Sequence, residues 1–197
     1  MTSMFDLGPA ARQMTRLLDS VSDRQLDDRT PCPDYTVGDL IEHIGGLALA
    51  FTWAAAKDAG AGTSQRPSGD ASRLGEDWRA RIPEQLSGLE QAWRDPDAWQ
   101  GMTRAGGIDL PSEVAGQVAI NELVIHGWDL ARASNQDYAI DARSLEACLN
   151  FVTAMSDQGE EAGRDGLFGP VVPVSDDAPD LDRAIGLSGR DPGWVSR

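Results

Sequence analysis

The feature that most constrains this chain is the helical spacing of its apolar residues, which runs through the first three-quarters of the sequence. Apolar side chains recur every three or four residues, as on one face of an amphipathic helix, and no convincing β-type alternation is present. The spacing predicts helices over residues 9–22, 36–57, 71–93, 111–130 and 144–155. An all-α, antiparallel four-helix bundle is the most economical way to bury these faces.

Local signals mark the ends of these helices. Thr36 can cap the second helix, because Asp39 three residues later completes a capping box. Pro83 lies inside the third segment and is expected to kink or divide it. Residues 60–69 are rich in Gly, Ser and Pro and predict a long flexible loop between helices, while residues 95–109 read as irregular.

The domain organisation follows from length and from a change in composition after Gly159. A length of 197 residues predicts one compact domain. Beyond Gly159 the sequence is rich in Gly, Pro and Asp, and its spacing predicts one short helical turn near residues 181–187. We therefore expect residues 1–160 to form the bundle and residues 161–197 to form a short irregular C-terminal extension packed on it.

Charge excludes two classes of partner. The chain has 17 Lys and Arg against 32 Asp and Glu, a net charge of −15 that argues against a general nucleic-acid binder and a polybasic membrane-surface protein. Its longest apolar stretch, residues 44–56, is too short to span a bilayer, and the N-terminus lacks the pattern of a secretory signal. Two cysteines, Cys32 and Cys148, are too few for a disulfide framework. We expect a cytoplasmic protein.

The only two histidines fall inside predicted helices. Glu122 precedes His126 by four residues, so both side chains share one helix face, and His43 can supply a third ligand from a facing helix. Two histidines and a glutamate with open positions are typical of a catalytic zinc site, and the same donors suit nickel, iron or manganese. A hydrogen-bonded polar cluster without metal is the alternative at this stage.

Two longer motifs contain these residues and carry a family resemblance. TPCPDYTVGDLIEHIGG (residues 30–46) and NELVIHGWDLA (residues 121–131) resemble, in the right order, the two signatures of the mycothiol-dependent maleylpyruvate isomerase N-terminal domain family. FGPVVPVSDDA (residues 168–178) and GRDP (residues 189–192) resemble one actinobacterial branch of metal-binding proteins. The resemblance implies a DinB-like four-helix bundle that holds a divalent metal, usually zinc, at His43, Glu122 and His126.

The resemblance also implies a kind of chemistry. A low-molecular-weight thiol such as mycothiol would act as cosubstrate and attack a small electrophile, which gives isomerisation or S-transfer. The isomerase itself carries a further C-terminal domain, whereas only about forty residues follow the predicted bundle here, so its reaction is not carried over by name. A metal-stabilised module that binds or senses a small molecule and a zinc-dependent hydrolase remain as alternatives.

Other residues have weaker signals. Asp129 is expected either to orient the imidazole of His126 or to pair with Arg132. Asp39, four residues before His43, is in the same way a candidate to orient the imidazole of His43. Trp128 is expected to pack in the core, and Cys32 to pack in its loop. The acidic residues after residue 175 read as a solvated face. A homodimer that buries some of the six tryptophans is compatible with the composition.

Overall fold

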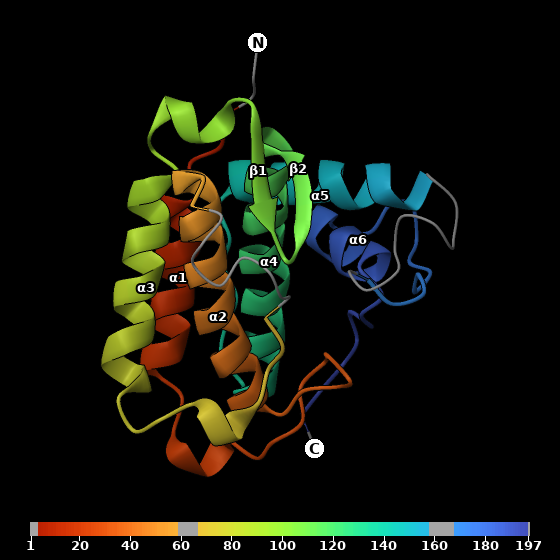
Figure 1. Ribbon diagram of the computed structural model, residues 1–197. Coiled ribbons are helices and arrows are strands. Elements are labelled where there is room, and N and C mark those ends of the chain that lie inside the picture. The colour runs from red at the N-terminus through yellow and green to blue at the C-terminus, as the bar shows by residue number, and fades with distance from the viewer. Residues whose placement is uncertain (1–3, 59–66, 158–167, 197) are drawn as a thin grey trace.

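The computed structural model describes residues 4–58, 67–157 and 168–196. Within these ranges the chain is mostly helical and has one two-stranded hairpin (Figure 1). The helices are α1 (Gly8–Asp19), α2 (Val37–Ala56), α3 (Trp78–Ala92), α4 (Ser112–Ala133), α5 (Ala142–Asp157) and α6 (Asp180–Leu187). The short 3₁₀ turns are η1 (Asp23–Gln25), η2 (Ala71–Arg73) and η3 (Pro96–Trp99), and the strands are β1 (Met102–Ala105) and β2 (Ile108–Pro111).

Helices α1, α2, α3 and α4 lie side by side, and we call these four the helical core (Figure 1). Helices α3 and α4 each contact both α1 and α2. The side chains between them are those that gave the helical spacing. The helices predicted over residues 9–22, 36–57, 111–130 and 144–155 are confirmed to within three residues at each end, whereas the one predicted over residues 71–93 is helical only from Trp78, because residues 71–73 form the separate turn η2. The most deeply buried include Leu17, Leu40, Ile41, Leu86 and Ile120.

Local chemistry sets the start of α2 as the sequence indicates. The Thr36 hydroxyl accepts a hydrogen bond from the backbone N–H of Asp39, and the Asp39 carboxylate accepts one from the backbone N–H of Thr36. This capping box satisfies donors that a helix N-terminus otherwise leaves unpaired. In α3, by contrast, Pro83 neither divides nor ends the helix, which runs unbroken from Trp78 to Ala92. Pro83 lies in the second turn, where it removes a single backbone hydrogen bond.

The hairpin corrects the expectation of an all-α fold. Strands β1 and β2 pair antiparallel across Gly106 and Gly107, both of which have positive φ. The tight turn therefore uses the residue type that adopts this conformation without strain. The Thr103 hydroxyl, which is buried, donates to the carbonyl of Ala54 and so fixes the hairpin against the end of α2. The region read as irregular is thus η3 followed by an ordered strand pair.

Chain direction is a second correction, because the helical core is not fully antiparallel. Helices α2 and α3 point the same way, and α1 and α4 point the opposite way (Figure 1). The 21 residues that separate α2 from α3 are long enough to permit this direction. The predicted flexible loop, residues 60–69, lies mostly outside the described residues, and its last part, residues 67–69, leads into η2 without regular structure.

The C-terminal segment, by which we mean described residues 168–196, lies with α5 against one side of the helical core. Helix α5 crosses the direction of the core helices, and α6 packs on α5 (Figure 1). The predicted boundary at residues 160 and 161 lies outside the described residues. The helical turn predicted near residues 181–187 is confirmed as α6. Near the C-terminus, Nε of Arg132 on α4 donates to the carbonyl oxygen of Trp194 at 3.0 Å.

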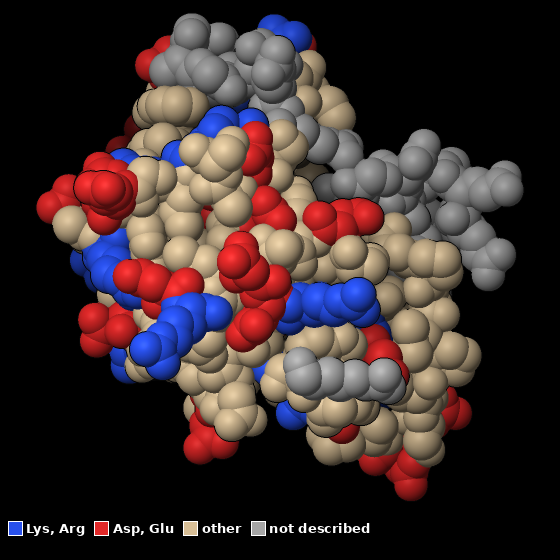
Figure 2. Space-filling model, turned by 90° about the horizontal axis from the view of Figure 1, so that it is seen from below, with Lys and Arg blue, Asp and Glu red and all other residues tan. Residues whose placement is uncertain are grey.

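The end of the molecule seen from below carries interleaved acidic and basic side chains (Figure 2). Several form ion pairs between elements: Arg79 of α3 with Asp23 of η1 at 2.6 Å, and Arg73 of η2 with Glu42 of α2 at 3.2 Å. Among the described residues, no helix has both the length and the apolar character needed to cross a membrane.

Two tryptophans close the upper end of the core. The indole N–H of Trp93 donates to the carbonyl of Phe51, and that of Trp99 donates to the carbonyl of Trp93. Their rings meet edge to face, 4.9 Å apart, and are each 2% exposed. Gly116 of α4 lies directly beneath them, because a Cβ built there would stand 2.5 Å from the Trp99 ring and 2.9 Å from the Trp93 ring.

Replacement of Gly116 by alanine is therefore expected to lower the free energy of unfolding by about 1–3 kcal/mol, because the buried rings have nowhere to move. Gly88→Ala in α3 is the matched control, since a Cβ at that position meets nothing within 4 Å. The control should raise stability by about 0.5–1 kcal/mol through helix propensity. Urea unfolding of both variants checks the pair, and equal stability of Gly116→Ala and the unsubstituted protein would contradict this packing.

Candidate metal centre

Two neighbouring helices bring both histidines together in the interior. His43 lies in the first half of α2, and Glu122 and His126 lie one turn apart on the face of α4 that packs against it. The ring centroids of His43 and His126 are 5.0 Å apart, and one ligand atom from each of the three residues lies within 4.8 Å of the other two. The structure thus brings together all three sequence-predicted ligands.

The imidazole of His126 is held between two carboxylates. Its Nε2 lies 3.0 Å from Oε2 of Glu122, and its Nδ1 lies 3.0 Å from Oδ2 of Asp129. A histidine that donates from Nδ1 to a carboxylate has its ring orientation fixed and Nε2 directed toward the cluster, which is the usual arrangement behind a metal-binding histidine. Asp129 therefore orients His126, and Arg132, the other partner considered for it, binds Trp194 instead.

Asp129 is fully buried and has its own counterion. Arg190, from the segment after α6, donates from Nη2 to Oδ2 of Asp129 at 3.1 Å, and its Nε lies 3.4 Å from Oδ1. The guanidinium also donates from Nη1 to the carbonyl of Ser188. A buried carboxylate without such a partner is strongly unfavourable, so Arg190 is needed for the position of Asp129.

His43 differs from His126 in its hydrogen bonding. Its Nδ1 is buried and makes no hydrogen bond of normal geometry, although the backbone of Pro67 lies close enough to the ring to act on its pKa. A neutral imidazole beside a histidine and a glutamate can supply one nitrogen donor to a metal ion. The ring of Tyr35 packs beside that of His43, with centroids 5.1 Å apart.

The surroundings shift the pKa values of the two histidines in opposite directions. Burial, together with the charge of His126, lowers the pKa of His43 to about 4. Burial also opposes the charged form of His126, but hydrogen bonds to Asp129 and Glu122 outweigh it and raise its pKa to about 9. Burial acts to raise the pKa of Glu122, yet its bond to His126 and nearby positive charge leave that pKa lowered. At neutral pH, His43 is a free base and His126 holds a proton that a bound cation would displace.

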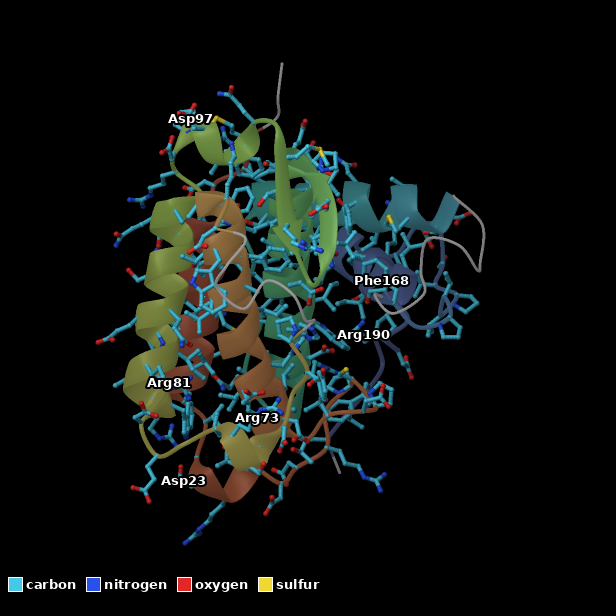
Figure 3. The ribbon with its side chains drawn as sticks, in the orientation of Figure 1. Asp23, Arg73, Arg81, Asp97, Phe168 and Arg190 are labelled. Atoms are coloured by element: carbon cyan, nitrogen blue, oxygen red, sulfur yellow. The ribbon has the colours of Figure 1, made fainter. Side chains whose placement is uncertain are left out.

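The three residues lie in the wall of a cavity of about 640 Å³, within the size range of small-molecule sites. Helices α2 and α4, the hairpin, the loop before α2 and the C-terminal segment all contribute to its wall. Phe168 and Arg190 both line the cavity, and Figure 3 shows them on the side of the helical core where α6 lies.

The remaining sequence candidates have structural roles. Asp39 caps α2 and accepts from the backbone N–H of Ala71, so its carboxylate is used away from the cluster. Trp128 is 4% exposed and packs in the core, as expected. Cys32 lines the cavity from the loop before α2, and burial raises the pKa of its thiol to about 11. Asp176, Asp177 and Asp180 are exposed.

Sequence reasoning missed the role of Arg190. The GRDP motif that contains it contributed to the resemblance, but its contact with Asp129 joins residues 61 positions apart and has no local spacing that could reveal it. Tyr35 and Phe168 were missed as cavity residues for the same reason.

Fold and cluster together define a class: a mostly helical protein with a His–Glu–His cluster at the wall of a cavity. The chain belongs to the mycothiol maleylpyruvate isomerase N-terminal domain family, whose family model matches residues 7–131. Two uncharacterized proteins of Mycobacterium tuberculosis, MT0763 and Rv0738, are each 32% identical over 130 residues. That match covers 64% of this chain and 63% of each relative.

Two solved structures share the fold. They are the crystal structure of the mycothiol-dependent maleylpyruvate isomerase and that of a mutant of it, with TM-scores of 0.58 and 0.59 and identities of 19% and 20%. Each alignment covers 80% of this chain and 71% of the solved chain.

The opposite pKa shifts lead to a direct test on the metal-free protein. We expect the His43 imidazole to titrate at about pH 4 and the His126 imidazole at about pH 9, so that the two rings differ in protonation across the neutral range. The His126 proton stabilises the folded state fully below the ordinary value of 6.5, and this stabilisation is lost as the pH rises through about 9. NMR of the imidazole nitrogens measures both midpoints, and two midpoints near 6.5 would contradict the described cluster.

Proposed function

We propose that this protein holds one divalent metal ion, zinc in the first instance, through His43, Glu122 and His126. We further propose that it uses the centre for a thiol-dependent isomerisation or transfer on a small electrophile. The observation that carries the proposal is the convergence of three donor atoms within 4.8 Å at the wall of a cavity.

The donor set fits such an ion. Two neutral imidazoles and one carboxylate leave a divalent ion with a net charge of +1 and with positions for further ligands, as in catalytic zinc sites. When bound, the metal supplies positive charge that favours the thiolate form of a thiol. The chain's own residues orient and enclose the centre, because Asp129 fixes the ring of His126 and Arg190 fixes Asp129.

The choice of thiol rests on the comparisons. Family membership and the solved neighbours, which are mycothiol-dependent maleylpyruvate isomerases, support mycothiol as the cosubstrate. The family model matches residues 7–131, and the curated relatives match over 63% of their length, so maleylpyruvate is not carried over as the substrate.

Metal content is the first test of the proposal. Untagged protein, never exposed to a nickel column, is expected to contain about one zinc per chain by mass spectrometry. His126→Ala and Glu122→Gln should each lose stoichiometric metal, because each removes one of the three donors and leaves only two protein ligands. Glu146→Gln, at an exposed position of α5, is the matched control and should keep its metal. Retention of zinc at equal affinity by His126→Ala would remove the metal assignment.

Thiol binding is the second test. Replacement of the zinc by cobalt should give a protein whose absorption gains a sulfur-to-cobalt charge-transfer band when mycothiol is added, and His126→Ala should show no band. Turnover of electrophilic probes is then expected only with thiol present. Ester or amide hydrolysis without thiol would instead support a hydrolase. Thermal stabilisation by a ligand without turnover would support a sensing module.

A further inference from the structure

The cavity is amphipathic along its length, and its polar end is the His–Glu–His cluster. We infer that the substrate is an electrophile with an apolar hydrocarbon body that lies along α2, α4 and the hairpin while its reactive group faces the cluster. The statement that the reactive group faces the cluster rests on the proposed function. The statement that the substrate body is apolar rests on the residues of the cavity wall alone.

One wall comes from a single face of α2. His43, Leu47, Ala50 and Phe51 all line the cavity and follow one another at helical spacing. Eight residues of helix advance about 12 Å, so the wall changes from imidazole to hydrocarbon over that length. The side chain of Leu47 is only half-buried, which leaves its surface available to a ligand.

The facing wall of α4 changes in the same direction. His126, Glu122 and Val118 line the cavity at intervals of four residues, so each lies one turn beyond the last on one face. Because α2 and α4 run in opposite directions, the apolar parts of both faces lie toward the same end of the core (Figure 1). That end is where the hairpin lies.

The hairpin and the C-terminal segment complete the apolar end. Ile108 and Leu110 of β2 line the cavity, and Ile108 is 54% exposed, which is high for a large aliphatic side chain. Phe168 also lines the cavity and packs edge to face on Phe151 of α5, with ring centroids 6.3 Å apart. In Figure 3, Phe168 lies nearer the hairpin than Arg190 does.

The charges around the cavity disfavour a small dianion as the substrate. With a metal bound and His126 neutral, the charged groups among the described lining residues are Asp34, Glu122 and Arg190, and Arg190 is already paired with Asp129. A doubly charged anion would therefore meet a single, already bonded cation beyond the metal. A small dianion would also bury little hydrocarbon against the apolar walls of the cavity.

Ligand length gives the measurable consequence. Burial of a methylene group contributes about 0.8 kcal/mol, which is about a fourfold gain in affinity. We therefore expect affinity for the zinc-loaded protein to rise about fourfold per methylene from acetohydroxamic to hexanohydroxamic acid. The hydroxamate head binds the metal in every member of the series, so calorimetry isolates the effect of the tail.

Two residues of the hairpin provide a matched pair of variants. Ile108 lines the cavity, whereas Met102, 58% exposed on the paired strand, is not among the residues that line it. Ile108→Ser should lower the gain per methylene and leave acetohydroxamate affinity unchanged, while Met102→Ser should change neither. A series with equal affinities at one zinc per chain would overturn the inference and leave the metal proposal intact.

A second arm keeps the inference testable if no metal binds. The metal-free protein is titrated with ethanol, 1-butanol and 1-hexanol, and NMR shifts at Leu47 and Phe51 report binding. Affinity is expected to rise with chain length and to rise less in Ile108→Ser than in Met102→Ser. Binding that does not depend on length would overturn the apolar assignment independently of the cluster.

Discussion

The packing of α2 against α4 is the contact on which the rest of the site depends. Each of the two helices contributes side chains both to the core and to the cavity wall. The packing of the helices therefore also sets the geometry of the cavity. This packing brings the ring of His43 to within 5.0 Å of the ring of His126, between centroids. The same packing removes the cluster from water, which strengthens every electrostatic interaction within it.

Buried charge is the second constraint, and it extends beyond the helical core. Glu122, His126, Asp129 and Arg190 form one continuous chain of hydrogen bonds between an acidic ligand and a guanidinium. Each group satisfies the charge or the hydrogen-bonding capacity of the next, as buried polar groups require. The C-terminal segment is therefore part of the centre's electrostatic environment although the family model matches only residues 7–131.

The parts of the molecule that follow local rules could be predicted from the sequence. The capping box of Thr36, the helical spacing of the core residues and the i,i+4 pair of Glu122 and His126 all lie within a few positions of the chain. The hairpin could not be predicted, because its strands are four residues long, expose Met102 and Ile108, and are fixed by a hydrogen bond from Thr103 to a carbonyl 49 positions away. The parallel course of α2 and α3 depends on a connection whose path no local pattern specifies.

The distance in sequence between Asp129 and Arg190 has a consequence for the order of assembly. Asp129 is synthesised 61 residues before its counterion Arg190, when α1, α2 and α3 are complete and α4 is still being extended. Before Arg190 docks, His126 is the charged partner left to Asp129, and loss of one partner from a buried ion pair typically costs about 3–5 kcal/mol. The contact between Asp129 and His126 therefore reaches its full stability only after residue 190 has been added to the chain. Maturation of the centre is in this way coupled to synthesis of the C-terminal segment.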